Sequence, residues 1–333
     1  MRKWGLEMIR CPACGGSLSL TSSLEEGGHI MSGQLRCETE GLAFPIIAGV
    51  PRLRADYKSS SEQQTVEAFG IQWKTFDKTT GPLGSMELFL DNLRGFPAEG
   101  FAGKNILEVG CGGGQWLLNM AKLGSDRIVG LDFSESVEPC FEKTKHLENV
   151  LIVQASIFDR AIAPDCFDAA ISIGVLHHLY DPQEGFRQMC RLVKPGGNAA
   201  FWVYGREGNG LYLFLSKPFR WIGPQLGKRL RIAVSCLLAF PFWLYTRTPL
   251  CKILGVRKDG SERLPLGKYC VFLSTVHFSD IVMLIFDQLT PELAAYLKKE
   301  EIERWFQGTD VELSSILPRN GMSWSVVGTR MTG

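Results

Sequence analysis

The sequence lacks the long apolar run that a membrane-spanning helix needs. Its longest apolar stretch, IAVSCLLAFPFWLY at 232–245, has 14 residues and contains Pro241, whereas a span takes about 20. The opening residues, MRKWGLEMIRCPACGG, also contain no apolar core of signal-peptide length. We therefore expect a cytosolic (cytoplasmic) protein whose ten cysteines are thiols or metal ligands rather than disulfides.

A charge of one sign, an internal repeat and a low-complexity tract are also missing. The 333 residues carry a formal net charge of +1, with 45% hydrophobic and 21% charged residues. This composition is ordinary for a globular chain with one large domain and an appendage, or with two domains. It gives no overall attraction to nucleic acid, which we do not expect as a partner.

Changes of pattern divide the chain into four segments. Residues 1–55 hold short strand-like runs between glycine pairs, and residues 56–103 hold a polar linker and helical sequence. Residues 104–204 and 270–333 alternate strand, turn and helix, which predicts an α/β fold with a parallel sheet, and two last runs joined by PRNG predict a closing hairpin. Residues 205–269 interrupt this alternation, and we interpret them as a helical insertion or lid.

A glycine-rich turn follows the first expected strand of this sheet. The stretch ILEVGCGGGQW has glycine at 110, 112 and 114, just before a helix whose N-terminus can face a ligand. A dinucleotide-binding turn would have its third glycine at 115, where this chain has glutamine. Glu108 ahead of the turn suits an amino group or a sulfonium better than a pyrophosphate. Asp132, at the end of the next strand, is placed to bind ribose hydroxyls.

Four motifs in order resemble those of the class I S-adenosylmethionine-dependent methyltransferases, particularly the group with ubiquinone and menaquinone methyltransferases. They are ILEVGCGGG, GLDFS, FDAAISIGVLHHLYDP and LVKPGGNAAFWV, all within 104–204. The resemblance implies a doubly wound, mostly parallel seven-stranded Rossmann-like sheet that binds S-adenosylmethionine. The cofactor contacts that it implies are Gly110, Gly112 and Gly114 along the methionine, Glu108 near its amino group, Asp132 at the ribose, Phe133 at the adenine, and Cys111, Ser156, Ile157 and Gly174 nearby. The family commonly has an acid where this chain has Ser156, and Asp159 follows three positions later.

The motif after the fourth strand is GVLHHL, not the Asn-Pro-Pro-Tyr type that many methyltransferases of nucleobase or glutamine amino groups use. We therefore expect a methyltransferase (EC 2.1.1 class) for a small-molecule or lipid-linked acceptor, at oxygen or carbon rather than nucleobase nitrogen. His177 and His178 are candidate catalytic bases for a hydroxyl acceptor, with packing as the other interpretation. A catalytically silent cofactor-binding scaffold and a tRNA-modifying methyltransferase remain alternative functions.

An aromatic segment precedes the core of this pattern. FGIQWKTF, at 69–76, places Trp73 and Phe76 on one helical face. This spacing favours packing in the hydrophobic core, and folding over the cofactor is the alternative that the resemblance suggests.

The N-terminal cysteines resemble those of zinc-ribbon modules that pair with, or are fused to, methyltransferases. Cys11 and Cys14 form one Cys-x-x-Cys pair, but the second pair is reduced to Cys37 with Glu40 at the fourth position. Carboxylate oxygen is a permitted zinc ligand, so these four residues are the candidate zinc site, and His29 is an alternative fourth ligand. A ribbon without metal, held by its own apolar core, is the other interpretation.

The segment 205–269 is basic as well as apolar. It holds twelve basic and three acidic side chains, a net charge of +9, which leaves −8 for the rest of the chain. Such a segment can lie on an anionic membrane surface or bind a lipid-linked acceptor. A substrate lid or a homo-oligomer contact would have the same composition.

Overall fold

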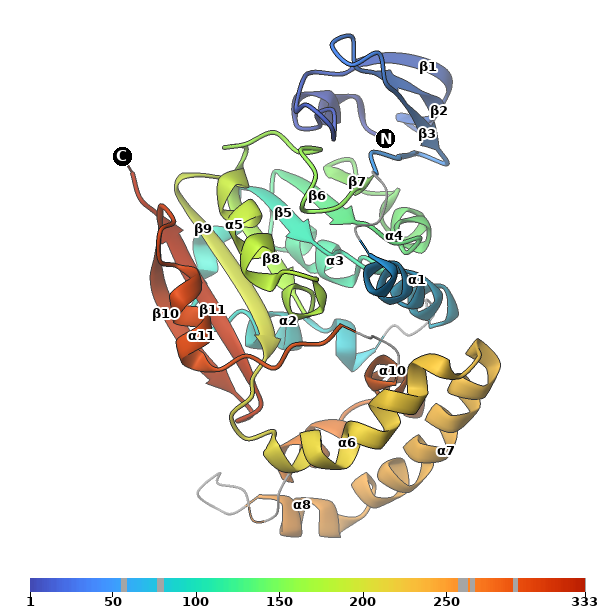
Figure 1. Ribbon diagram of the computed structural model, residues 1–333, viewed down its shortest axis with the longest axis vertical. Coiled ribbons are helices and arrows are strands. Elements are labelled where there is room, and N and C mark those ends of the chain that lie inside the picture. The colour runs from blue at the N-terminus through green and yellow to red at the C-terminus, as the bar shows by residue number, and fades with distance from the viewer. Residues whose placement is uncertain (55–58, 77–80, 257–262, 264–266, 290–292, 333) are drawn as a thin grey trace.

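The computed structural model describes residues 1–54, 59–76, 81–256, 263, 267–289 and 293–332. Along the long axis of the molecule an N-terminal β module is followed by a central sheet with helices and then by a helical cap (Figure 1). The chain passes from the module through helix α1 (Ser60–Thr75) into the central sheet, and it leaves the sheet once to build most of the cap.

The N-terminal module is a four-stranded antiparallel sheet in the order β1-β2-β3-β4. A short 3-10 turn (Lys3–Glu7) precedes β1 (Ser19–Glu26), β2 (His29–Arg36), β3 (Ala43–Ile47) and β4 (Val50–Pro51). Gly27 and Gly28, both with positive φ, make the turn between β1 and β2. The small β-rich module predicted from the sequence is confirmed.

The central sheet has seven strands in the order β10-β11-β9-β8-β5-β6-β7. Their bounds are β5 Asn105–Val109, β6 Arg127–Asp132, β7 Val150–Gln154, β8 Phe167–Ile173, β9 Val193–Tyr204, β10 Val311–Arg319 and β11 Ser323–Arg330. Strands β5 to β9 pair in parallel, and the hairpin β10–β11 joins antiparallel to β9. The predicted mostly parallel sheet with its closing hairpin is therefore confirmed.

Helices cover both faces of this sheet, as its near-continuous apolar strands require. One face packs against α2 (Met86–Asn92), α3 (Gln115–Lys122) and α4 (Val137–Thr144). The other packs against α5 (Pro182–Leu192), α11 (Lys299–Trp305) and the N-terminal module, whose Ile9 and Leu35 belong to the same continuous core as Leu151 of β7. The module and the sheet therefore share one hydrophobic core.

The cap lies beyond the carboxyl ends of the parallel strands (Figure 1). It consists of α6 (Gly210–Ile222), α7 (Lys228–Thr246), α8 (Pro249–Gly255), α9 (Gly267–Leu273) and α10 (Phe278–Gln288). Its own core brings Ala239 of α7 against Leu273 and Ile281. Cap helices thus continue to Gln288, past residue 269, where the sequence pattern placed the end of the insertion. No helix within the described part of the chain is both long and apolar enough to cross a membrane.

Candidate cofactor and acceptor cavity

The glycine turn between β5 and α3 is held in a conformation that favours glycine. Gly110 and Gly112 have φ of 76° and 49°. A Cβ on Gly110 would lie 2.3 Å from a methyl carbon of Val175, and one on Gly112 would lie 2.6 Å from the ring of Trp73. Side chains at these two positions would therefore close the space in front of the turn. The third glycine of the pattern, Gly114, packs against Cys140 behind the turn and does not line the cavity described below.

Asp132 closes the turn from the end of β6. Its Oδ2 accepts the backbone N–H of Gly112 at 2.9 Å, and its Oδ1 accepts the N–H and the hydroxyl of Ser134 at 2.8 and 2.7 Å. These bonds hold the carboxylate at the mouth of the turn. Oδ1 already accepts two hydrogen bonds, whereas Oδ2 accepts one and keeps acceptor capacity for a ligand hydroxyl.

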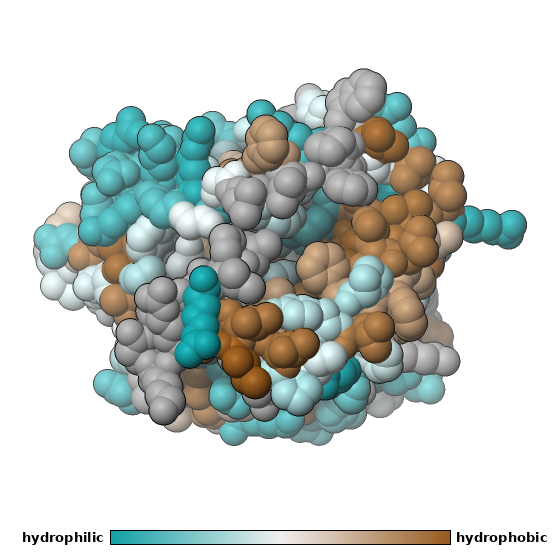
Figure 2. Space-filling view, turned by 90° about the horizontal axis from the view of Figure 1, so that it is seen from below, coloured by the Kyte–Doolittle hydropathy of each residue, from teal (hydrophilic) through white to brown (hydrophobic). Residues whose placement is uncertain are grey.

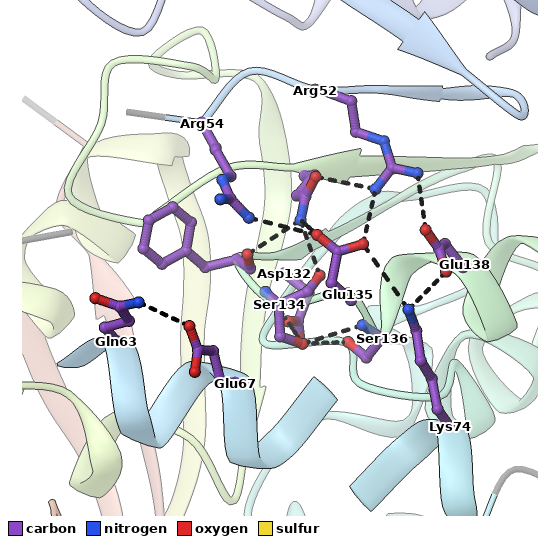
Figure 3. Close-up of polar contacts among 12 residues, drawn as sticks. Arg52, Arg54, Gln63, Glu67, Lys74, Asp132, Ser134, Glu135, Ser136 and Glu138 are labelled. Atoms are coloured by element: carbon purple, nitrogen blue, oxygen red, sulfur yellow. Dashed lines mark hydrogen bonds and ion pairs between the residues drawn. The ribbon is translucent and has the colours of Figure 1, made fainter. Parts of the chain in front are cut away.

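The loop after Asp132 is tied to the N-terminal module and to α1 (Figure 3). Arg52 and Arg54, which follow β4 of the module, both pair with Glu135, and Lys74 of α1 pairs with Glu135 and with Glu138, the latter at 2.8 Å. The Arg54 guanidinium also lies 5.9 Å from the ring centre of Phe133, the expected adenine contact. The N-terminal module and α1 thus both contact this loop.

Glu108 lies deeper, on β5, and is fully buried. Neither of its carboxylate oxygens has a hydrogen-bond partner. Burial raises the pKa of Glu108 well above the usual range, and the nearby charge of Asp132 adds to the rise. The carboxylate does not line the cavity. A positive charge in front of the turn would favour the ionised form of this carboxyl group, so the site suits a positively charged ligand.

A cavity of about 590 Å³ runs from the glycine turn to the cap helices. Of the expected cofactor contacts that the structure describes, it is lined by Gly110, Cys111, Gly112, Asp132, Phe133, Ser156, Ile157 and Gly174. Asp159, three positions after Ser156, turns back so that its Oδ2 accepts the Ser156 N–H at 3.3 Å. The third strand therefore ends with a carboxylate close to Ser156, although not at the position where the family commonly has one.

Helix α1 forms one wall of the cavity. Trp73 lies against Gly112 and Gly113, so the aromatic segment does cover the turn, whereas Phe76 packs against Phe286 of the cap at 5.7 Å between ring centres. The sequence favoured core packing for both residues, but only Phe76 is packed in this way. Helical spacing places the two residues on one face of α1 but does not predict which part of the structure that face contacts.

The two adjacent histidines have different environments. His178 lines the cavity, and its Nδ1 lies 2.7 Å from the carbonyl oxygen of Leu293. His177 points away from the cavity and is fully buried among rings, 4.1 Å from Tyr204 between ring centres. Neither His177 nitrogen has a hydrogen-bond partner, and burial lowers the pKa of His177 well below its usual value.

The far end of the cavity carries a hydrogen-bonded group of polar residues that we call the acceptor-end cluster: Tyr204, Tyr212, Asp287, Gln288 and Tyr296. Tyr204 donates to Asp287 Oδ2 at 3.0 Å and accepts from the Gln288 amide at 3.0 Å. Tyr212 and Tyr296 donate to Gln288 Oε1 at 2.5 and 3.3 Å. We did not find this cluster in the sequence, because its members come from β9, α6, α10 and the segment after it and follow no spacing rule.

Comparison with known proteins agrees with this geometry. Residues 107–201 match the family model "Methyltransferase domain", and residues 6–49 match "Trm112p-like protein". The chain is 31% identical over 166 residues to the ubiquinone biosynthesis O-methyltransferase of Vibrio parahaemolyticus, covering 48% of this chain and 69% of that protein. The chain belongs to the class I S-adenosylmethionine-dependent methyltransferases.

Other members of the family match over shorter stretches. The enzyme of the same name from Pectobacterium carotovorum is 34% identical over 146 residues, covering 42% of this chain and 60% of that protein. A solved S-adenosylmethionine-dependent methyltransferase from Mesorhizobium loti is 15% identical, with a TM-score of 0.45, covering 74% of this chain and 99% of that one. The chain spans about half to three fifths of the length of several of the curated relatives that it matches.

This methyltransferase also brings three of the four expected metal ligands together. The Sγ atoms of Cys11, Cys14 and Cys37 lie within 4.8 Å of one another. The backbone N–H of Glu40 lowers the pKa of Cys37, which favours a thiolate there. Glu40 itself is exposed and lies outside this group of ligand atoms, and His29 instead contacts the carbonyl oxygen of Lys145 at 2.8 Å through Nε2. Spacing predicted that the three cysteines lie together but not the direction of the Glu40 side chain.

Proposed function

We propose that this protein transfers a methyl group from S-adenosylmethionine to a small-molecule or lipid-associated acceptor, most favourably at an oxygen. The observation that carries the proposal is a single cavity with a nucleotide-type end, formed by the glycine turn and Asp132, and a polar end that contains His178. The family match supports the same conclusion.

The residues of the first end fit the cofactor. Gly110 and Gly112 leave room in front of the turn, Asp132 would hold the ribose hydroxyls and Phe133 would pack on the adenine. The unpartnered carboxyl group of Glu108 lies behind the turn, and the ammonium and sulfonium charges of the donor would favour its ionised form. When bound, S-adenosylmethionine supplies a methyl group on a sulfonium sulfur, which an acceptor atom displaces in line.

His178 is the residue that we assign to proton removal from an acceptor hydroxyl. Because a carbonyl oxygen only accepts, His178 must donate from Nδ1 to Leu293, and the neutral ring then carries its lone pair on Nε2. Asp287 would stabilise the protonated ring, since the charge of His178 opposes the rise that burial causes in the Asp287 pKa. His177, sealed among aromatic rings, has a packing role in this proposal.

Cofactor binding is tested by calorimetry with S-adenosylmethionine and S-adenosylhomocysteine. Asp132→Ala should weaken binding about 10- to 100-fold, since a hydrogen bond to a charged group contributes about 1.5–3 kcal/mol. Asp126→Ala, which removes an exposed carboxylate on the loop ahead of β6, should leave the affinity unchanged. Failure of the wild type to bind either ligand would contradict the proposal.

Methyl transfer is tested with isotopically labelled donor and separated lipid, RNA, protein and small-molecule fractions. We expect label in the lipid or small-molecule fraction. His178→Gln should lower kcat by about 10²- to 10⁴-fold with cofactor affinity retained, as loss of a general base does. Label only in RNA would instead support the tRNA-modifying alternative, and cofactor binding without any transfer would support the silent scaffold.

We also propose that the cap contacts anionic membranes. Figure 2 views this end of the molecule from below, where hydrophobic side chains gather with hydrophilic ones between them. On α7, Leu237 is 74% and Phe240 is 56% exposed, and Lys228 and Arg229 begin the same helix; Phe214 of α6 is 70% exposed. Exposed apolar and basic side chains on one helix are typical of proteins that lie on a membrane surface.

Flotation with phosphatidylglycerol vesicles tests this contact. The double variant Leu237→Ser/Phe240→Ser should float less, whereas Leu24→Ser, which removes a 54% exposed side chain from the module, should float as the wild type does. Phosphatidylcholine vesicles should bind weakly, because the basic residues need an anionic partner. Equal binding of both lipids would remove the electrostatic part of the proposal.

Finally, we propose that the three gathered cysteines bind zinc in a structural role. Thiolates are the ligands that structural zinc prefers, and Cys11 and Cys37 are buried in the module. Elemental analysis should find one zinc per chain, and Cys37→Ser should lose it together with thermal stability. Cys166→Ser, outside the module, should retain the metal.

A further inference from the structure

The acceptor-end cluster presents hydrogen-bond acceptors to the cavity. The protons of the Tyr204, Tyr212 and Tyr296 hydroxyls are already donated to Asp287 and Gln288. Both amide contacts of Gln288 Nε2 are also directed within the cluster, to Tyr204 and Asp287. What these groups can still offer a ligand is lone pairs, on the tyrosine oxygens and on the carboxylate.

The charge of the lining is negative. Among the described lining residues, Glu62, Asp132 and Asp287 carry carboxylates, and Arg319 is the cation. Arg319 is paired with Asp91, so its charge is already compensated. Asp132 lies at the cofactor end and Glu62 lies near Tyr180 in the first turn of α1, so Asp287 is the carboxylate of the acceptor-end cluster.

Asp287 belongs to the last turn of α10 and accepts hydrogen bonds from Tyr204 of β9, from the Gln288 amide and from Gln72 of α1. Its side chain is open to the enclosed cavity, where removal from bulk water raises its pKa, so a positive or proton-donating neighbour would stabilise its charge.

From this arrangement we infer that the cavity selects acceptors whose polar head donates hydrogen bonds and carries no negative charge, a hydroxyl or an ammonium, and that Asp287 is the residue that rejects anionic heads. A carboxylate or phosphate head would meet a like charge and find few donors, and a site whose buried polar groups are left unpaired rejects a ligand strongly. The inference rests on the proposed function in taking this end of the cavity as the acceptor end.

Three probes with one tail test the selection: 4-butylphenol, 4-butylbenzylamine and 4-butylbenzoate, which are neutral, cationic and anionic at pH 7.5. Trp73 and Trp202 line the cavity, so their fluorescence reports binding, and calorimetry provides a second readout. We expect the phenol or the amine to bind at least about tenfold more tightly than the benzoate. Whichever of the two binds more tightly shows whether the preferred head is a hydroxyl or an ammonium group.

Variants of Asp287 test whether its charge causes the discrimination against the benzoate. Asp287→Asn should bring the benzoate affinity to within about threefold of the phenol affinity, whereas Asp287→Glu, which keeps the charge, should retain the discrimination. Glu312→Gln, which removes an exposed carboxylate on β10, should behave as the wild type. Benzoate binding as tight as phenol binding, or an unchanged ratio in Asp287→Asn, would overturn the inference.

The measurements are made both without cofactor and with saturating S-adenosylhomocysteine. Failure of S-adenosylhomocysteine to bind would contradict the proposed function, while the probe ratios without cofactor would still decide the selectivity of the cavity. The two conclusions can therefore fail separately.

Discussion

Replacing His177 by phenylalanine should remove an acid-sensitive step in the stability of this protein. The imidazole is buried without a hydrogen-bond partner and packs against the rings of His178 and Tyr204, so a phenyl ring of similar size can take its place. Burial lowers the pKa of His177 well below its unfolded value of 6.5. The unfolded chain therefore takes up a proton at a pH where the folded chain does not, and stability falls as the pH drops below 6.5.

The size of this loss follows from the linkage relation. With an unfolded pKa of 6.5, the free energy of unfolding falls by at most about 1.4 kcal/mol between pH 7.5 and 5.5, and by at most about 2 kcal/mol by pH 5.0. The loss ends at the folded pKa, where the native ring also binds its proton.

Urea unfolding of the wild type and His177→Phe at pH 7.5 and 5.0 measures this contribution, because other titrating groups cancel in the double difference. We expect the variant to lose up to about 2 kcal/mol less than the wild type, and His146→Gln, at an exposed site, to follow the wild type. The same pH dependence in the variant would refute the argument. Retained methyl transfer by His177→Phe would confirm a packing role, whereas its abolition would make His177 a catalytic candidate again.

Two further substitutions test the cofactor end of the cavity. Glu108→Gln should weaken S-adenosylmethionine binding in calorimetry. Because burial raises the Glu108 pKa, the protonated group stabilises the folded wild type below pH 4.5, and this contribution is lost as the pH rises through the folded pKa. The thermal stability of cofactor-free Glu108→Gln should lack that decline with pH. Arg52→Ala removes a hydrogen bond to Gln154 and two ion pairs, and should lower the free energy of unfolding by about 1–3 kcal/mol and weaken cofactor binding. The exposed ion pair of Lys3 with Glu25 is the comparison, and Lys3→Ala should lower the free energy of unfolding by less than about 1 kcal/mol.

The central sheet and the cofactor end could be predicted from the sequence because their signals are local. A glycine turn between a strand and a helix, and an acid at the end of the next strand, each lie within a few residues, and parallel strands bring those ends to one edge. The structure places Gly110, Gly112 and Asp132 together for this reason. The burial of Glu108 without a partner is a three-dimensional property that its place beside the turn did not reveal.

The acceptor end could not be predicted because its contacts arise only when the cap folds over the sheet. Tyr204 and Asp287 are 83 positions apart and share no motif. The cap also continues to Gln288, beyond residue 269. The sequence did not reveal this, because α10 is as apolar as a core helix and so resembles a continuation of the sheet domain. Likewise, the pattern at Cys37 predicted a ligand at Glu40, but the backbone there turns the N–H rather than the carboxylate toward the sulfur.

The position of the N-terminal module has a consequence for solubility. Strand β7 is the last strand on its side of the central sheet, and such an edge can pair with other chains and aggregate. The module covers it: Leu53 donates its N–H to the carbonyl oxygen of Gln154, Gly5 packs on Leu151, and beyond β7 the N–H of Ala163 donates to the carbonyl oxygen of Met8. A chain that lacked the module would expose this edge and apolar side chains of the shared core, so we expect it to self-associate, whether or not the module also binds a metal.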